Sequence, residues 1–216
     1  MKRVNLLAGG PVDQWASELA TITTVPGQWI TADRGTLRLL QQGVTPTIAV
    51  GDFDSITPAE KEQVLAAVSD IRSVQAEKDE TDTQLALSIA FEELQADRVV
   101  VYGATGGRID HFLANLFMAV EERFRTVLNR IEMRDRQNTI QFYAPGTYEL
   151  TKEADKKYLA FIPLVPTTDL NLVDEKYPLT HFDTKVPISW ASNEFIGEKA
   201  HFNFKTGIVA VIQSKD

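Results

Sequence analysis

The sequence predicts an α/β protein with two domains: a three-layer domain with a mainly parallel sheet over residues 1–136 and an antiparallel β-sandwich over residues 137–216. The first prediction depends on short apolar segments that alternate with amphipathic segments up to about residue 135. Repeated strand–helix alternation is typical of a parallel sheet with helices on both faces. The second prediction depends on shorter segments with period-two alternation between turn residues, which is typical of a sandwich or barrel.

The first domain alternates expected strands with expected helices. In the segment 82–94, Leu85, Ile89 and Leu94 lie along one helical face. Right-handed crossovers place the carboxyl ends of parallel strands at one edge of the sheet, where such sheets bind ligands. The expected strands are Val4–Ala8, Trp29–Ala32, Thr47–Gly51, Ile71–Gln75 and Val99–Gly103. The expected helices are Asp13–Thr21, Thr36–Gln42, Pro58–Val68, Asp82–Leu94 and Asp110–Phe124.

The second domain is expected to contain strands only. Turn residues such as Pro145-Gly146 and Thr206-Gly207 separate them. The segment Val127–Arg134 either adds a last strand to the first sheet or connects the two domains. The expected strands are Thr139–Tyr143, Thr147–Leu150, Lys157–Ile162, Asp169–Leu172, Ala200–Lys205 and Ile208–Gln213.

Composition excludes several classes of protein. With 216 residues, 44% hydrophobic and 24% charged, the chain is expected to be an ordinary soluble globular protein. No apolar run approaches the roughly 20 residues that cross a bilayer, and Met1-Lys2-Arg3 leads into a strand, so we expect no membrane partner. The chain has no cysteine, which excludes disulfides and thiolate chemistry and favours a cytoplasmic location. A net charge of −8 argues against a nucleic-acid partner, although a cation could still bridge the protein to ATP.

Aspartates recur where expected strands end or an expected helix begins. Carboxylates repel one another unless a cation lies between them. Hard oxygen ligands suit Mg²⁺, which usually enters a site together with a phosphorylated substrate. The pattern therefore predicts a site for a metal-bound nucleotide. These residues are Asp33, Asp52, Asp54, Asp79 and Asp82.

Each aspartate segment also has a structural interpretation. Asp52 and Asp54 point the same way in an extended chain, so they can share a cation, or they can cap the amides of a turn. Thr81 and Gln84 have the spacing of a helix capping box, which accounts for Thr81 and for Asp79. Capping does not account for Asp82, nor for Lys78 just upstream.

A glycine-rich turn follows the last parallel strand, at residues 103–111. Glycines let backbone amides approach a phosphate, and the following helix N-terminus favours negative charge. Arg108 can add a forked contact, whereas Asp110 can instead cap its helix. The chain contains no Walker motif. Gly9-Gly10-Pro11 is a second candidate for nucleotide contact.

In the second domain, Ser192-Asn193-Glu194-Phe195 forms a polar cluster beside Trp190 that would otherwise be interpreted as a loop.

Taken together, these segments resemble the thiamine pyrophosphokinase family over nearly the whole chain. Two positions depart from the family pattern: Arg34, where glycine is common, and Trp190, where a small residue is expected. The segments that carry the resemblance are Ala32–Gly35, Gly51–Ser55, Lys78–Asp82, Gly103–His111 and Ser192–Phe195.

The resemblance implies a Rossmann-like first domain and transfer of a pyrophosphoryl group from ATP to thiamine, with Mg²⁺ as cofactor. It implies a homodimer whose active site combines the first domain of one subunit with the sandwich of the other. By resemblance, the catalytic residues are Asp52, Asp54, Asp82 and Arg108, and the metal ligands are Asp52, Asp54 and Asp82. Contacts to the nucleotide or to thiamine are implied for Asp33, Lys78, Asp79, Thr81, Gly103, Thr105, Gly106, Gly107, Asp110, His111, Trp190, Ser192, Asn193 and Phe195.

Two other functions share parts of this pattern. A pyrophosphokinase acting on a pterin alcohol would share the ATP half of the site. A nucleotide-binding sensor would keep the fold without turnover, but it would not need the aspartate set. Sequence does not decide which carboxylate, Asp54 or Asp82, accepts the proton of the attacking alcohol.

Overall fold

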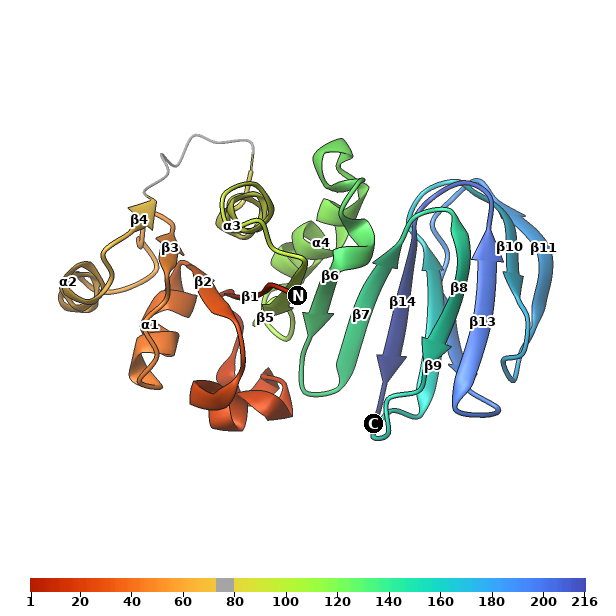
Figure 1. Ribbon diagram of the computed structural model, residues 1–216, viewed down its shortest axis with the longest axis horizontal. Coiled ribbons are helices and arrows are strands. Elements are labelled where there is room, and N and C mark those ends of the chain that lie inside the picture. Colours follow the sequence, from red (N-terminus) through yellow and green to blue (C-terminus); the bar gives the residue numbers. More distant parts are fainter. Residues whose placement is uncertain (73–79) are drawn as a thin grey trace. The chain divides into compact units, whose positions relative to one another are not determined.

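The computed structural model describes residues 1–72 and 80–216, which form two compact units (Figure 1). The first unit contains residues 1–116 and 133–136, and the second contains residues 117–132 and 137–216. In the described ranges, no helix is long and apolar enough to span a membrane.

The first unit is built on a mainly parallel sheet with the strand order β6-β5-β1-β2-β3-β4. β1 pairs in parallel with β2 and β5, β2 with β3, and β3 with β4. The predicted strand Ile71–Gln75 is observed as Ile71–Arg72, and residues 73–75 lie outside the described ranges. The strands are β1 (Arg3–Leu7), β2 (Gln28–Ala32), β3 (Ile48–Val50), β4 (Ile71–Arg72), β5 (Arg98–Tyr102) and β6 (Ile131–Arg134).

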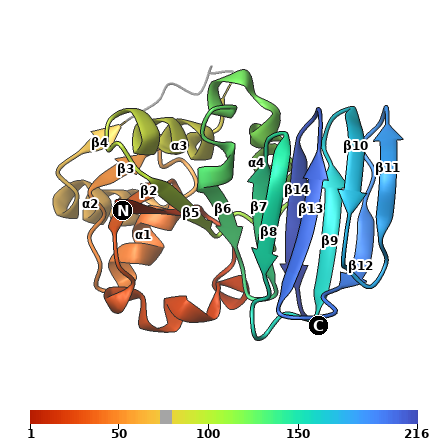
Figure 2. The same ribbon diagram turned by 45° about the vertical axis from the view of Figure 1, so that its right-hand side comes forward.

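Helices cover both faces of this sheet. α1 and α3 both pack against β1 and β2, and Figures 1 and 2 show them on opposite faces. On the α1 face, Leu7, Trp29 and Leu39 belong to one buried apolar cluster. Such burial on both faces explains why the strands are rich in apolar residues. The helices are α1 (Arg34–Gln41), α2 (Pro58–Ala67), α3 (Asp82–Glu92) and α4 (Ile109–Phe117).

Two predicted helices differ from the structure. The segment 13–21 forms 3₁₀ turns, η1 (Val12–Gln14) and η2 (Ser17–Thr24), with non-helical backbone angles at Thr21. The β-branched run from Thr21 to Thr24 lowers the helix propensity there. The helix predicted over 110–124 ends at Phe117, and the chain continues as further 3₁₀ turns: η3 (Met118–Val120), η4 (Glu122–Phe124) and η5 (Leu128–Arg130).

The second unit contains two antiparallel sheets, with the strand orders β12-β9-β14-β7 and β11-β10-β13-β8. Their buried side chains form one core cluster, in which Phe161 of β9 contacts Phe202 of β13 at a ring-centroid distance of 5.1 Å. The strands are β7 (Asn138–Tyr143), β8 (Gly146–Thr151), β9 (Tyr158–Pro163), β10 (Thr167–Leu172), β11 (Leu179–Thr184), β12 (Trp190–Glu194), β13 (Lys199–Phe204) and β14 (Val209–Ser214).

Two of these strands, β11 and β12, are not evident from the sequence. Both are interrupted by register shifts, and both contain a residue with positive φ, His181 in β11 and Ser192 in β12. Such irregularities break the period-two alternation that identifies a strand. The predicted combination of a mainly parallel sheet with a separate antiparallel sheet is confirmed.

Candidate active site

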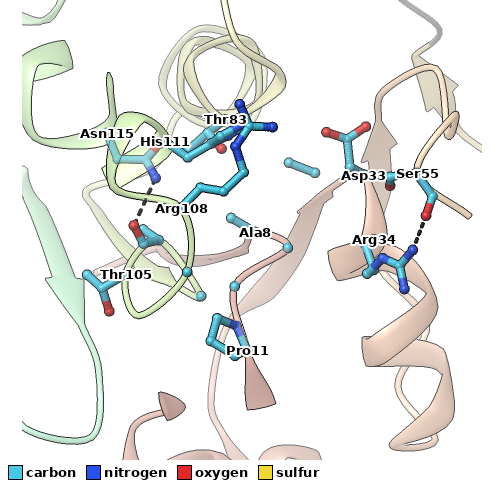
Figure 3. Close-up of a pocket in the computed structure, with 16 residues that line it drawn as sticks. Ala8, Pro11, Asp33, Arg34, Ser55, Thr83, Thr105, Arg108, His111 and Asn115 are labelled. Atoms are coloured by element: carbon cyan, nitrogen blue, oxygen red, sulfur yellow. Dashed lines mark hydrogen bonds between the residues drawn. The ribbon is translucent and has the colours of Figure 1, made fainter. Parts of the chain in front are cut away.

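A pocket of about 320 Å³ lies in the first unit, at the carboxyl ends of the parallel strands (Figure 3). Figure 3 shows Asp33, Arg34 and Ser55 on one side, with Arg108, His111 and Asn115 on the other. This is the edge at which the sequence predicts ligand binding. The lining residues are Ala8, Gly9, Gly10, Pro11, Ala32, Asp33, Arg34, Ser55, Thr83, Gly103, Ala104, Thr105, Gly107, Arg108, His111 and Asn115.

One side of the pocket is formed largely by backbone, and we call Gly9, Gly10, Gly103 and Gly107 the glycine wall. The Gly10 amide donates to the carbonyl oxygen of Gly103 over 2.8 Å. A Cβ atom on Gly10 would overlap the Gly103 carbonyl, and Gly103 itself has a φ of +64°. Only glycine permits this approach of the two loops without strain. The glycine wall therefore leaves backbone atoms open to a ligand, as a phosphate site requires.

The other side carries Asp33, which interacts with three further aspartates. We call Asp33, Asp52, Asp54 and Asp82 the aspartate cluster. Burial, then a hydrogen bond with Asp82 and the charges of Asp82, Asp52 and Asp54, together raise the pKa of Asp33 to about 8. A hydrogen bond between two carboxyl groups requires that one of them is protonated. Of the four, only Asp33 lines the pocket directly.

Asp33 is held in an unusual conformation. Its φ is 48° and its ψ is −125°, a combination that costs a non-glycine residue roughly 1–3 kcal/mol. Its Oδ1 atom is buried and has no hydrogen-bond partner in the described ranges. A side chain on Gly51, whose φ is +136°, would overlap this oxygen. The fold thus holds a strained carboxyl group at the strand edge.

The loop Asp52–Ser55 is fixed by both its side chains and its carbonyls. Asp52 Oδ1 accepts a hydrogen bond from the Asp54 amide over 2.9 Å, so the turn-capping interpretation of Asp52 holds locally. The carbonyl of Asp52 accepts from Lys61 Nζ over 2.6 Å, and the carbonyl of Ser55 accepts from Arg34. Phe53 is buried with a φ of 58°. The carboxylates of Asp52 and Asp54 are therefore carried on a well-anchored turn.

The capping box at the start of α3 is confirmed. Thr81 Oγ1 accepts from the Gln84 amide over 3.3 Å, and Gln84 Oε1 accepts from the Thr81 amide over 2.6 Å. This leaves Asp82 as the first helical residue, in contact with Asp33. Thr83 follows it and lines the pocket. Lys78 and Asp79 lie outside the described residues.

Arg108 and Asp110 of the glycine-rich turn pair with each other. Arg108 Nε and Nη2 donate to the Asp110 carboxylate over 3.1 and 2.5 Å. The hydrogen bond from Arg108 holds the pKa of Asp110 below its usual value. Both side chains are largely exposed, at 73% and 63%, so this ion pair contributes little stability and can exchange for a ligand. His111 and Thr105 line the pocket, whereas Gly106 and Asp110 do not.

Several pocket residues were not singled out from the sequence. The Asn115 amide donates to the carbonyl of Ala104 over 3.0 Å and so supports the glycine-rich turn from α4. Asn115 follows His111 by four residues, so helical spacing offered a signal. Arg38 donates to the carbonyls of Gly9 and Gly10 and anchors the first glycine loop. No sequence pattern identified Thr83 or Arg38, which lies outside the pocket lining, and Ser55 belonged to a segment that carries the family resemblance without being assigned a role.

The aspartate cluster has the donor chemistry for Mg²⁺ but does not form a complete metal site by itself. Among residues 1–72 and 80–216, no three Asp, Glu or His side chains converge closely enough to hold a metal ion. The oxygens are hard ligands, and the unpartnered Asp33 Oδ1 is a buried acceptor. These residues fit a Mg²⁺ ion that takes its remaining ligands from phosphate oxygens and water.

The predicted contacts of the second unit lie in and around β12. Asn193 is buried; its amide oxygen accepts from the Tyr177 and Glu194 amides, each over 2.9 Å, and its nitrogen donates to the Tyr177 carbonyl over 2.9 Å. Phe195 is buried in the core cluster. Trp190 is 36% exposed and lines a small pocket of about 80 Å³. Ser192 is exposed.

Comparison with known proteins identifies the family. Residues 26–129 match the catalytic domain model of thiamin pyrophosphokinase, and residues 147–209 match its vitamin B1 binding domain model. A curated thiamine pyrophosphokinase from Bacillus subtilis is 39% identical over the full length of both chains. The chain belongs to the thiamine pyrophosphokinase family.

Solved structures of the family share the fold. A thiamin pyrophosphokinase family protein from Enterococcus faecalis matches with a TM-score of 0.91 and 48% identity, covering all of both chains. The thiamine pyrophosphokinase from Bacillus subtilis matches with a TM-score of 0.86 and 38% identity, again covering both chains completely. A protein from Lactobacillus plantarum is 50% identical over all of both chains, with a TM-score of 0.91. The family resemblance predicted from the motifs is thus confirmed.

Proposed function

We propose that the chain transfers a pyrophosphoryl group from ATP to the hydroxyethyl oxygen of thiamine, giving thiamine diphosphate and AMP. The observation that carries this proposal is the pocket at the strand ends, which is lined by the glycine wall and by Asp33 of the aspartate cluster. Family membership supplies the reaction type and the acceptor. The pterin and sensor alternatives have no comparable support.

The glycine wall and Arg108 hold the nucleotide in this proposal. Backbone amides of residues 103–107 and the N-terminus of α4 favour the negatively charged phosphates. Arg108 leaves Asp110 and forms a forked contact with the phosphates, since an exposed ion pair is easily exchanged. Asn115 and Arg38 keep the two glycine loops in position.

Asp52, Asp54 and Asp82 would hold Mg²⁺, together with phosphate oxygens and water, and Asp33 would be a further ligand or the buried group that orients Asp82. The ion would neutralise charge on the phosphate oxygens as transfer proceeds. Lys78, Asp79 and Thr81 are proposed to complete this side of the site, by resemblance to the family. The anchored turn at Asp52–Ser55 limits reorganisation during the reaction, which favours electrostatic stabilisation of the transition state.

The reaction exchanges one bond to phosphorus for another. The thiamine hydroxyl oxygen attacks the β-phosphorus, the bond from that phosphorus to the oxygen bridging the α-phosphate breaks, and AMP leaves with the bond electrons. The hydroxyl proton passes to a carboxylate, Asp54 or Asp82. In such transfers, the positioning of the reacting groups contributes more to the rate than the basicity of the group that accepts the proton.

The second unit supplies the thiamine half. Trp190 presents an exposed ring that can stack on the cationic, aromatic substrate, and the exposed hydroxyl of Ser192 can hydrogen-bond to it. The Asn193 side chain hydrogen-bonds to the backbone of Tyr177, and the Phe195 side chain is buried in the core cluster. We therefore assign both residues to fixing the conformation of this segment. We further propose a cytoplasmic enzyme of two domains, 1–136 and a β-sandwich 137–216.

In this proposal the enzyme is a homodimer in which the thiamine half of one subunit serves the nucleotide half of the other. Light scattering should then give about twice the 24.1 kDa mass of the chain. A fully active monomer would contradict the shared site while leaving the reaction intact.

Acceptor dependence tests the reaction. Purified protein is incubated with Mg²⁺ and ATP, and AMP is measured with thiamine, with a pterin alcohol, or without an acceptor. We expect AMP only with thiamine. AMP that depends on the pterin alcohol would establish the first alternative, and tight ATP binding without AMP would establish the sensor.

A further inference from the structure

Arg34 places a cation at the pocket. It is the first residue of α1, directly after the strained Asp33, and it lines the pocket. Its guanidinium donates to the carbonyl oxygen of Ser55 and forms no ion pair within residues 1–72 and 80–216. A guanidinium has five N–H donors, so most of its donor capacity remains for other acceptors.

Among the described residues, Glu60 is close enough for its charge to interact with that of Arg34, which lowers the Glu60 pKa after the hydrogen bonds with Thr57, but the two side chains form no ion pair. The nearby Arg38 binds only the carbonyls of Gly9 and Gly10 among its described partners, and burial followed by the charge of Arg34 lowers its pKa. The Arg38 guanidinium thus lies beside the loop after β1 and the Arg34 guanidinium beside the loop Asp52–Ser55, each with backbone carbonyls as its described hydrogen-bond partners. Arg108, by contrast, is occupied by the Asp110 carboxylate. An anionic ligand would form stronger hydrogen bonds with the remaining N–H donors of Arg34 than water does.

We propose that Arg34 binds a phosphate group of the nucleotide from the side of the pocket opposite Arg108. This inference rests on the proposed function, because it requires ATP in this pocket. Figure 3 shows Arg34 next to Asp33 and across the pocket from Arg108. Arg34 therefore provides positive charge on the acidic side, where a polyphosphate would otherwise face carboxylates alone until a metal ion joins it. The bond to the Ser55 carbonyl keeps the guanidinium oriented toward that side.

A purely structural role for Arg34 makes a different prediction. In that case Arg34 only anchors the Asp52–Ser55 loop, as Lys61 does through the Asp52 carbonyl. Lys61 does not line the pocket, so it is a matched control that carries the same charge and contacts the same loop. The two roles are separated by comparing Arg34→Gln with Lys61→Gln, and by asking how far Arg34→Lys restores function.

The experiment measures binding of α,β-methylene-ATP in Mg²⁺ by calorimetry, together with KM for ATP and for thiamine. Loss of a charge-assisted contact predicts that Arg34→Gln weakens binding and raises KM for ATP by about 10-fold or more. KM for thiamine should change by less than about 2-fold, since a phosphate contact does not touch the acceptor. Arg34→Lys should bind more tightly than Arg34→Gln but less tightly than wild type, because lysine keeps the positive charge but cannot form the bidentate contact of a guanidinium. Lys61→Gln, which loosens the same loop without removing a phosphate contact, should weaken binding less than Arg34→Gln does.

Unchanged binding by Arg34→Gln would overturn this inference and leave the proposed function intact. Equal losses in Arg34→Gln and Lys61→Gln would also overturn it, in favour of a loop anchor. Absence of analogue binding by the wild-type protein would reject the nucleotide site itself, and the inference with it. Circular dichroism of each variant confirms that the measured protein is folded.

Discussion

The two sides of the pocket are built in opposite ways. The glycine wall consists of backbone whose shape depends on the absence of side chains, as at Gly10 and Gly103. The aspartate cluster consists of side chains whose chemistry depends on burial and on their proximity, which in that order raise the pKa of Asp33. The first should be sensitive to added volume and the second to changed charge. A ligand with a polyphosphate chain and a metal ion requires both kinds of surface.

The largest expected effect comes from neutralising the aspartate cluster. Asp52→Asn, Asp54→Asn and Asp82→Asn should each lower turnover by roughly 100-fold or more, the scale of losing one preorganised electrostatic group. Their folds should persist, because Asp54 is exposed and Asp52 and Asp82 are half-buried. Steady-state AMP release and circular dichroism measure the two properties. Asp13→Asn, an exposed aspartate outside the pocket lining, is the control and should retain activity. Normal turnover in all three variants would refute the assignment.

A smaller effect is expected from adding one methyl group to the glycine wall. Gly10→Ala places a Cβ against the Gly103 carbonyl, so it should destabilise the protein by about 1–3 kcal/mol and weaken nucleotide binding. Gly197→Ala is the matched control, because a Cβ there meets nothing within 4 Å. It should alter stability by less than about 0.5 kcal/mol. Equal denaturation midpoints for the two variants would show that the close approach of the loops is unimportant.

The smallest effect concerns the pH dependence of the ligand-free protein. The pKa of Asp33 is about 8 in the folded state, against an ordinary value of 3.8. Between these values the unfolded chain has released a proton that the folded state retains, so this group lowers stability as pH rises from about 4 to about 8. Asp33→Asn should remove that slope, and the variant should gain stability relative to wild type toward pH 8. If the free energies of unfolding of wild type and Asp33→Asn, measured in urea, changed with pH in parallel, that would contradict a buried, protonated Asp33.

The position of the site could be predicted from the sequence, but its internal contacts could not. Asp33, Asp52 and Gly103 follow apolar segments, and parallel strands bring such residues to one edge. The contact of Asp33 with Asp82 depends on a φ of 48° and on the missing side chain at Gly51, which no local pattern encodes. The pairing of Arg108 with Asp110, and of Arg34 with Ser55, likewise depends on side-chain conformation.

The second unit shows the same limit more strongly. β13 alternates apolar and polar residues, β14 begins with an apolar run, and both strands were predicted within two residues. β12 carries Trp190 and Asn193 on an edge strand with a register shift, so alternation could not reveal it. The burial of Asn193 and Phe195 follows from contacts with the segment at Tyr177 and Glu175, which are distant in sequence.

The most direct test of the account follows the phosphorus atoms of ATP. ATP labelled at the β- or the γ-phosphorus is incubated with Mg²⁺, thiamine and the enzyme, and the products are separated. Transfer of a pyrophosphoryl group predicts that both labels enter thiamine diphosphate and that one unlabelled AMP is released for each product molecule. Transfer of the γ-label alone, with ADP as the second product, would contradict the account.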